Sequence, residues 1–386
     1  MRKGILCLPL AAALCLLAGC ARLLTSREAE QLQLVQTMGF DAASPGVIVS
    51  VSSGRALGDT PTARIAARGD SIPEAVQSLQ DWSAHEELFF AHTRYALIGE
   101  AMAKEGVEGI LDYFERGTQT RLDLPLFVVR GAEARSLVTG SEDGEYEITA
   151  LLSSLQREAE KLGTVHCFSL LDTAERLARS GTALCCALIG AEPGENAPSA
   201  GDGALAALAV GYAVLKDGAL VGWLDSDAAL GTDLLLGFSG SKTAVLPVGH
   251  GGTVTAEIRE CRAELTPVWD DSGALTALWE VSCRAGIVGS DGCDPRAPGM
   301  EETLDRELSH WVGERIEKAL DASQTLDADF TEVYRRLRRS APEAFPRTAP
   351  GDFLRTLRQE VRLSAAVERS YDIGGTADTR GTGARP

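Results

Sequence analysis

The sequence predicts a mixed α+β protein with two or three compact subdomains, each a mainly antiparallel sheet packed with helices. Segments rich in valine, isoleucine and leucine recur between glycine-containing turns, as in 46–54 and 204–215. Helical segments with capping signals fall between these strands. The 386-residue chain is 45% hydrophobic and 24% charged, which is an ordinary globular composition. Its length allows two or three domains.

The N-terminal half contains both kinds of element. Ser71 and Glu74 form a capping box with a proline in the first turn, which predicts a helix start. Gly106 is expected to break a later helix. The expected helices are 26–34, 71–82, 101–116, 145–161 and 168–179. The expected strands are 46–54, 62–70, 93–100, 124–131 and 183–191.

The segment 192–203 is interpreted as a linker, because it holds two prolines, three glycines and no apolar residue larger than alanine. It would separate an N-terminal domain (20–191) from a C-terminal domain (204–372), which can subdivide. The turn at 216–218 predicts a hairpin. The expected elements are strands 205–215, 219–224, 241–248, 252–264, 276–288 and 357–367, and helices 226–236, 301–323 and 330–339. The polar, glycine-rich tail (373–386) is expected to be disordered.

The N-terminus has the features of a lipoprotein signal peptide (1–19). Arg2 and Lys3 precede an apolar run from Ile5 to Ala18, which is shorter than the roughly 20 residues that cross a bilayer. The run ends in a Leu-Ala-Gly-Cys sequence that resembles the bacterial lipobox. Cys20 is therefore the predicted lipidation site, carrying a diacylglyceryl group and an N-acyl chain. The alternative is an ordinary secretory signal followed by an incidental thiol.

The chain is strongly acidic, with a formal charge of −18 that becomes −20 if Arg2 and Lys3 leave with the signal peptide. Such a surface repels nucleic-acid phosphates and anionic lipid headgroups, so nucleic acid is not an expected partner. Attachment to a membrane then requires another source of affinity. Two or more acyl chains supply it, at about 0.8 kcal/mol per buried methylene.

Six cysteines follow Cys20, too few in a chain of this length for a disulfide-framed scaffold. Cys185 and Cys186 lie in an apolar run and are expected to be buried thiols. Cys283 and Cys293 flank a loop rich in glycine and aspartate. They are the candidate disulfide pair, with two separate thiols as the alternative.

No motif of a catalytic or metal site is recognisable, so neither an enzymatic activity nor a catalytic residue, metal or cofactor other than the covalent lipid is predicted. The segment 237–241 approaches a nucleophile elbow but lacks its final glycine. The segment 240–243 lacks the glycine spacing of a phosphate loop. The five histidines lack the partner spacing of metal sites, and the loop aspartates lack the other ligands of an EF-hand.

Several segments together resemble the Ger(x)C family, the lipoprotein C subunits of spore germinant receptors. These are Arg27-Glu28, Gly39-Phe40-Asp41, the stretch FFAHTRYALIGEAMAKEGVEGILDYFER (89–116), the strand pair GYAVLKDGALVGWLD (211–225) and the closing helices and strand (301–370). They occur in the family's order over nearly all of the mature chain. Two positions depart from the family pattern: Ala21 stands where a tryptophan is frequent, and Gly117-Thr118 where an Asp-Pro or Asn-Pro pair is common.

The resemblance implies a non-enzymatic mixed α/β protein of three subdomains, lipid-anchored on the outer face of the cell membrane or spore inner membrane. It implies two integral-membrane partners, the A-type and B-type receptor subunits, and a part in assembly or signalling of nutrient-triggered germination. Glu100 and Arg116 stand where the family signature places charge. They are candidate partner contacts, although Glu100 also suits the positive end of a helix.

Two other functions remain open. A solute-binding lipoprotein would deliver a small molecule to a membrane transporter. Such proteins usually show doubly wound βαβ alternation in two similar lobes, whereas the two halves here differ and carry hairpin signals. A secreted hydrolase is supported by nothing beyond the incomplete motifs.

Overall fold

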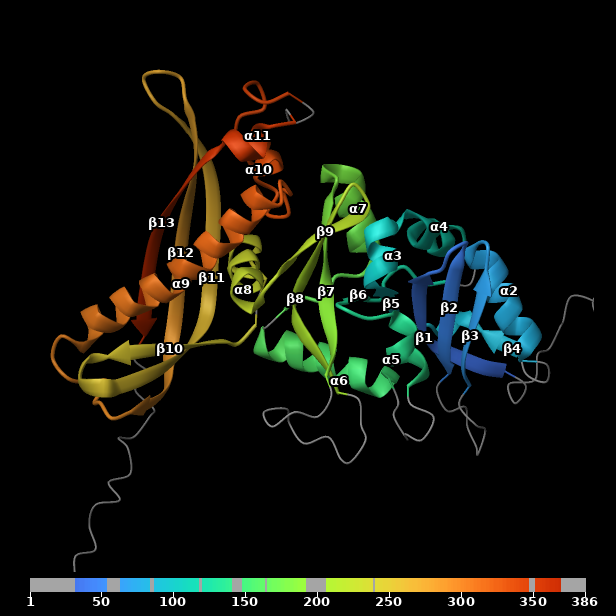
Figure 1. Cartoon of the computed structure of the whole chain (residues 1–386). Coiled ribbons are helices and arrows are strands. Elements are labelled where there is room, and N and C mark those ends of the chain that lie inside the picture. Colours follow the sequence, from blue (N-terminus) through green and yellow to red (C-terminus); the bar gives the residue numbers. More distant parts are fainter. Residues whose placement is uncertain are drawn as a thin grey trace, which may run out of the picture.

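The computed structural model describes residues 32–53, 63–83, 87–117, 120–140, 148–163, 165–191, 206–238, 240–346 and 351–368. Within them the chain forms two β-sheets with helices packed on both (Figure 1). The predicted signal peptide, Cys20, the linker 192–203 and the tail 373–386 lie outside the described residues.

The larger sheet has parallel strands at its centre and antiparallel strands at both sides. Its strands are β1 (Leu32–Ala42), β2 (Val47–Ser53), β3 (Arg64–Gly69), β4 (Glu87–Phe89), β5 (Tyr95–Gly99), β6 (Leu126–Val129), β7 (Thr182–Ala191), β8 (Ala206–Lys216) and β9 (Ala219–Leu224). Their order is β3-β2-β1-β5-β6-β7-β8-β9, with β4 beside β1. The neighbours among β1, β5, β6 and β7 are parallel. The α+β class is confirmed, and the parallel centre was not predicted.

This sheet continues across the boundary predicted at 192–203. β7 ends before that segment and β8 begins after it, and the two pair antiparallel along most of their length, with Cys185 opposite Ala213. The pairing adds an observation to this prediction: the first hairpin of 204–372 completes the sheet of the N-terminal half. The physical reason is that β7 is almost wholly buried and needs a paired neighbour along each edge.

The smaller sheet has the order β10-β11-β12-β13 and carries a long hairpin that protrudes beyond the helices (Figure 1). Its strands are β10 (Lys242–Val248), β11 (Gly252–Trp269), β12 (Leu275–Asp291) and β13 (Arg358–Glu368). β10, β11 and β12 pair antiparallel, whereas β13 returns parallel to β12. A parallel return requires a crossover connection, which the helices between β12 and β13 provide.

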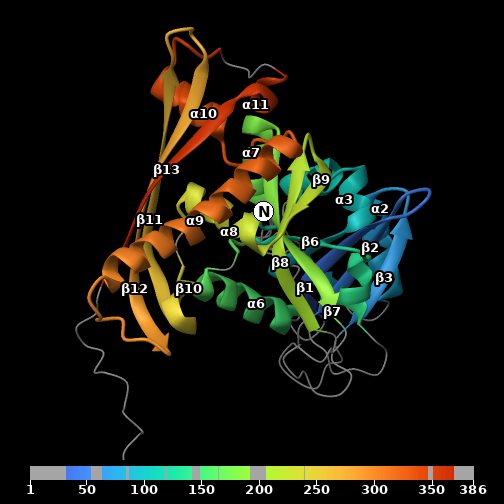
Figure 2. The same ribbon diagram turned by 60° about the vertical axis from the view of Figure 1, so that its left-hand side comes forward.

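The helices cover both faces of the larger sheet and one face of the smaller one (Figure 2). One core lies under α2, α3, α4 and α7, a second under α5, α6 and α8, and a third between the smaller sheet, α9 and α10. The helices are α2 (Ile72–Trp82), α3 (Glu100–Glu105), α4 (Glu108–Arg116), α5 (Ala134–Thr139), α6 (Ile148–Leu162), α7 (Leu170–Ser180), α8 (Ser226–Leu236), α9 (Met300–Thr325), α10 (Val333–Ser340) and α11 (Phe353–Thr356), with 3₁₀ turns η2 (Phe90–His92) and η3 (Gly249–Gly251).

Most predicted elements are confirmed where the signal is local. The Ser71 side chain accepts a hydrogen bond from the Glu74 N–H at the start of α2. Asp217 and Gly218 both have positive φ, 49° and 80°, as the two central residues of the β8–β9 turn require. The prediction of a helix over 26–34 is wrong at its end, because β1 begins at Leu32 and alternates buried and half-buried residues there. The short helix α5 was not predicted.

Candidate functional site

Two acidic side chains from the segments that resemble the Ger(x)C family lie at the carboxyl ends of neighbouring parallel strands. Asp41 is near the end of β1, and Glu100 follows β5. The buried Asp41 carboxylate accepts hydrogen bonds from the N–H groups of Ala134 (2.6 Å) and Arg135 (2.8 Å), so it caps the start of α5. Burial raises the pKa of Asp41, and these two hydrogen bonds oppose the rise. The role of Asp41 is therefore structural.

Glu100 is also committed to local contacts. One carboxylate oxygen accepts from the Gly131 N–H at 2.5 Å, and the other pairs with Lys104 at 2.6 Å. The hydrogen bond from Lys104, followed by that from Gly131, lowers the pKa of Glu100. As the first residue of α3 it also meets the positive end of the helix dipole. Its carboxylate joins the start of α3 to the loop after β6 and is 21% exposed.

Arg116 lies on a different surface feature. It is at the end of α4, and its 79% exposed side chain pairs with Asp112 at 2.6 Å, one turn earlier in the same helix. This hydrogen bond raises the pKa of Arg116. Glu100 and Arg116 therefore have separate partners, and their roles as partner contacts remain proposals.

A buried polar cluster joins the two sheets. Asp233 of α8 pairs with Lys242 of β10 at 3.2 Å and accepts a hydrogen bond from the Tyr212 hydroxyl of β8 at 2.6 Å. The same hydroxyl accepts from the His166 N–H at 2.5 Å. The side chains of Asp233 and Lys242 are 2% and 3% exposed. Burial raises the pKa of Asp233 to about 6, with Lys242 opposing, and burial lowers the pKa of Lys242.

This cluster was not predicted from the sequence. Lys242 belongs to the segment 240–243 that resembled an incomplete phosphate loop, and it enters β10 as a buried ion-paired residue instead. The sequence offered one indication of this cluster: Asp233 is the only charged residue in the mostly apolar stretch 228–236. A lone charge in such a stretch requires a partner, but the sequence does not say which residue supplies it.

Ion pairs at the surface also connect the elements of the larger sheet to the helices of the smaller one. Asp327, which follows α9, pairs with Lys216 of β8 at 2.9 Å and with Arg355 of α11 at 3.3 Å. Asp227 of α8 pairs with Arg315 of α9 at 3.2 Å and with Lys318. These contacts, together with the Asp233 cluster, fix the smaller sheet against the edge formed by β8 and β9. These contacts therefore hold the smaller sheet and its helices against the larger sheet.

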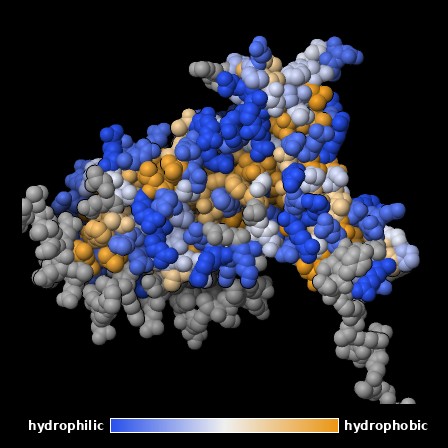
Figure 3. All heavy atoms as spheres, turned by 180° about the vertical axis from the view of Figure 1, so that it is seen from behind, coloured by the Kyte–Doolittle hydropathy of each residue, from blue (hydrophilic) through white to orange (hydrophobic). Residues whose placement is uncertain are grey.

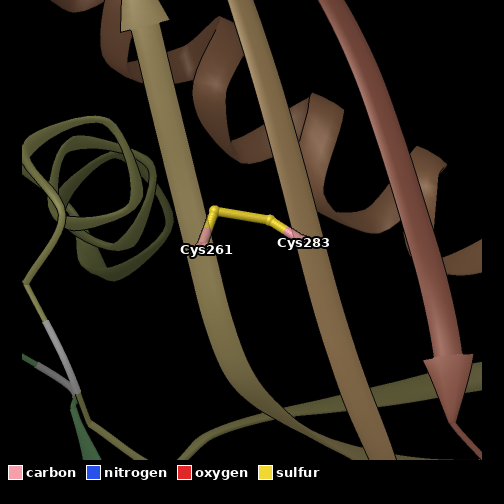
Figure 4. Close-up of a disulfide and its surroundings, with 2 residues drawn as sticks. All are labelled: Cys261 and Cys283. Atoms are coloured by element: carbon pink, nitrogen blue, oxygen red, sulfur yellow. A yellow bond between two sulfur atoms is a disulfide. The ribbon is translucent and has the colours of Figure 1, made fainter.

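The cysteines pair differently from the sequence-based candidate. The disulfide joins Cys261 of β11 to Cys283 of β12, which lie directly opposite each other in the strand register, with Cα atoms 4.2 Å apart (Figure 4). Cys293 lies beyond the end of β12 and donates to the Thr253 carbonyl. Loop proximity suggested Cys283 and Cys293, but strand register decides the pair. Cys185 and Cys186 are buried thiols, as predicted, and burial raises the pKa of Cys185 to about 12.

Peptide mapping of the unreduced mature chain should therefore recover a fragment pair linked through Cys261 and Cys283. Replacing Cys293 with serine should leave this linkage intact, because Cys293 takes no part in it, whereas replacing Cys283 should abolish it. Recovery of a linkage between Cys283 and Cys293 would contradict the register described above.

Two cavities in the described part of the chain are small. One cavity of about 120 Å³ opens beside Lys216 and Asp327, and another of about 160 Å³ lies beside Arg94 and Arg121. Both are below the roughly 300 Å³ at which ligand pockets begin. Across the described ranges, three or more His, Cys, Asp or Glu side chains nowhere gather in a metal-binding arrangement. No helix among the described residues has the length and apolarity to cross a bilayer.

Comparison with known proteins identifies the family. Residues 25–190 match the family model for the spore germination protein N-terminal domain, and residues 210–370 match the model for the spore germination B3/GerAC-like C-terminal domain. The chain belongs to the GerAC family of spore germination proteins. The resemblance seen in the sequence is thereby confirmed, and the two matches meet near the predicted linker, although the larger sheet crosses it.

Two relatives extend this result. Spore germination protein KC of Bacillus subtilis (strain 168) is 26% identical to this GerAC-family chain over 152 residues, which is 36% of each protein. The match thus spans about a third of that relative. The crystal structure of the GerBC protein superposes with a TM-score of 0.56 over 86% of this chain and 96% of its own, at 14% identity. At that identity the superposition shows a shared fold.

Proposed function

We propose that this protein is a non-enzymatic, lipid-anchored subunit of a spore germinant receptor, required for assembly or signalling in nutrient-triggered germination. The observation that carries the proposal is the match of both family models, in order, to almost the whole chain after its predicted signal peptide. Among the described residues, Asp233 forms a buried ion pair with Lys242, and Asp41 accepts a hydrogen bond at the start of α5.

In this proposal the protein is held on the outer face of the spore inner membrane by the acyl chains at Cys20. It docks there on two integral-membrane subunits, of the A and B types. Tethering raises the concentration of the protein at the surface of its partners, so a weak interface can stay occupied. The exposed Arg116 is a candidate contact with a partner, and the partly exposed Glu100 is a second.

The tether is tested by replacing Cys20 with alanine. We expect the variant to lose its lipid, to leave the membrane fraction and to lose most of its assembly with integral proteins, because a chain of charge −18 has no other attraction to an anionic bilayer. Fractionation of spore membranes and immunoprecipitation followed by mass spectrometry measure both effects.

A second variant makes this test sharper, since an uncleaved signal peptide could itself hold the chain in the membrane. Residues 1–20 are exchanged for a secretory signal with an ordinary cleavage site, so that the mature chain is released without lipid. If this cleaved, unlipidated form stayed on the membrane and supported normal germination, the tethering mechanism would be wrong.

The alternative function is a solute-binding lipoprotein that delivers a small molecule to a transporter. Its expected architecture is two similar doubly wound lobes, whereas the described residues form one large mixed sheet and one small sheet of different topology. Calorimetric titration of the mature chain with amino acids and sugars separates the two functions. Strong binding by this subunit alone would favour the alternative.

A further inference from the structure

Two helices far apart in the sequence bring arginines together on one surface of this acidic protein. α7 contributes Arg176 and Arg179, and α10, whose sequence is VYRRLRRS, contributes Arg335, Arg338 and Arg339. We call these five residues the arginine surface. The ion pairs of Arg176 and Arg335 with one glutamate place the two helices side by side. In the view from behind, strongly hydrophilic patches lie beside hydrophobic ones on the surface of the molecule (Figure 3).

The positive charge on this surface is only partly neutralised. Within the described residues, three of the five arginines pair with two carboxylates, Glu175 and Glu332. Arg338 and Arg339 have no acidic partner among them, and Arg339 is exposed. The Nε of Arg338 is buried without a hydrogen-bond acceptor there. An excess of cations in a chain of charge −18 is a local feature that the average composition does not explain.

Glu332 shows what these arginines bind. Its carboxylate is 6% exposed and lies 3.2 Å from Arg176 and 3.9 Å from Arg179, while Arg335 binds its other oxygen. Its backbone has φ of 59°, in the left-handed region that is unfavourable for a residue other than glycine. Such strain persists only where surrounding contacts outweigh it. The chain therefore already supplies one carboxylate to the inner side of the cluster.

The outer side of the cluster remains open to solvent. Arg179 and Arg335 are 41% and 46% exposed, and Arg339 lies one turn after Arg335 on the same face of α10. The guanidinium of Arg176 is held against the ring of Phe168, with its carbon 4.9 Å from the ring centroid. These donors lie on two helices that the ion pairs of Glu332 join, so some of their positions are fixed before any partner arrives.

The chemistry of the surface favours a carboxylate-bearing protein segment over a bilayer. All five cations are arginines, whose planar fork matches carboxylates in two-bond geometry. A bilayer would have to attract a chain whose overall charge of −18, which already includes these arginines, opposes an anionic surface. A short acidic segment, in contrast, contacts only the arginine surface and is attracted by its local excess of positive charge. Charge complementarity of this kind also orients the partner.

We infer that the arginine surface formed by α7 and α10 is the docking site for an acidic segment of a partner protein. This inference rests on the proposed function, which requires partners, and adds to it a surface and the chemistry of the segment that binds there. Arg179, Arg335 and Arg339 make the outer contacts, and Glu332 holds the inner side of the cluster in place.

The test uses the lipidated chain in nanodiscs of zwitterionic lipid, titrated with hexaglutamate and with hexaglutamine. We expect salt-sensitive binding of hexaglutamate only. The double variant Arg335→Glu and Arg339→Glu should weaken it by about tenfold or more, because attraction becomes repulsion. The double variant Arg358→Glu and Arg362→Glu on β13 makes the same change in charge at exposed positions and should stay within about twofold of the wild type.

Because Arg335 contacts Glu332, its reversal could also disturb folding. Arg339→Glu alone avoids this, since Arg339 is exposed and has no described partner, and it should still weaken binding. Equal loss in the β13 variant, or none in the Arg339 variant, would overturn the inference. Loss of hexaglutamate binding when the nanodiscs contain phosphatidylglycerol would also overturn the inference. That result would show that the arginine surface binds lipid. Self-association of the chain that the Arg339 variant abolishes would assign it to a second copy.

The same variants in spores separate this inference from the proposed function. The Arg339 variant should remain lipidated and membrane-bound but should co-purify with less of its integral-membrane partners. If the wild-type chain co-purifies with such partners and the variant does so equally well, the arginine surface is not the interface while the function stands. If the wild-type chain co-purifies with none, the proposed function itself fails.

Discussion

Replacing Lys242 with methionine is expected to lower the free energy of unfolding by about 3–5 kcal/mol near pH 8. The methionine fills most of the volume of the lysine but removes the cation that lies 3.2 Å from Asp233. Asp233 is 2% exposed, so its charge would be left in the interior with only the Tyr212 hydroxyl to stabilise it. Urea unfolding followed by circular dichroism measures the loss.

The loss should shrink as the pH falls. Burial raises the folded-state pKa of Asp233 to about 6, above its ordinary value of 3.8. A raised folded-state pKa means that the contribution of Asp233 to stability is fully present below pH 3.8 and is lost as the pH rises through 6. Without Lys242 the pKa of Asp233 rises further, because the cation opposes the effect of burial. At pH 5 the carboxyl group of the variant is then neutral in the fold, and the penalty is smaller than at pH 8.

Lys318→Met is the matched control. Lys318 also pairs with an aspartate, Asp227, but its side chain is 52% exposed. Water solvates the remaining charge, so the variant should unfold almost like the wild type at both pH values. Equal losses in the two variants would show that burial does not set the strength of the Asp233–Lys242 pair. A Lys242 penalty that grew toward pH 5 would contradict the assigned direction of the Asp233 pKa.

Features predicted from the sequence are those whose determinants lie within a few residues. The cap of α2 depends on Ser71 and Glu74, and the β8–β9 turn on Asp217 and Gly218. Family membership was also predictable, because the motifs follow one another in order. Interactions between distant segments were not predictable in this way. Glu332 meets Arg176, more than a hundred residues earlier, and no local pattern in either helix indicates the other.

The predicted domain boundary and disulfide pair illustrate the same limit. A segment rich in proline and glycine was interpreted as a linker because of its composition, but composition does not reveal that β7 pairs with β8 across it. Cys283 was paired with Cys293 because a loop brings their chain positions close, whereas the β11–β12 register places Cys261 opposite Cys283. Register is set by the turn of the hairpin and by burial along both strands. For the candidate contacts Glu100 and Arg116, the sequence indicated charge but not the local partners that already bind them.

Replacing Gly231 with alanine adds only one methyl group, yet it should lower the free energy of unfolding by about 3 kcal/mol. Gly231 lies in α8 where this helix crosses α9, and a Cβ built there would stand 1.9 Å from the carbonyl oxygen of Arg315. That oxygen belongs to the helix backbone, so the two helices must move apart to admit the methyl group. Separation would also loosen the Asp227–Arg315 pair and the core between α8 and α9. Thermal unfolding of the purified mature chain measures the change.

Gly313→Ala in α9 is the control, because it makes the same substitution within the same pair of helices. The nearest atom that a Cβ at Gly313 would meet is Leu363 Cδ2 at 3.9 Å, an ordinary van der Waals distance. Alanine has a higher helix propensity than glycine, so this variant should gain about 0.5–1 kcal/mol. We expect opposite changes in stability for the two variants, because only Gly231, and not Gly313, is in close contact with the backbone of the neighbouring helix. If both were stabilising, α8 and α9 would not be packed backbone to backbone, and the rigid connection between the two sheets would need another explanation.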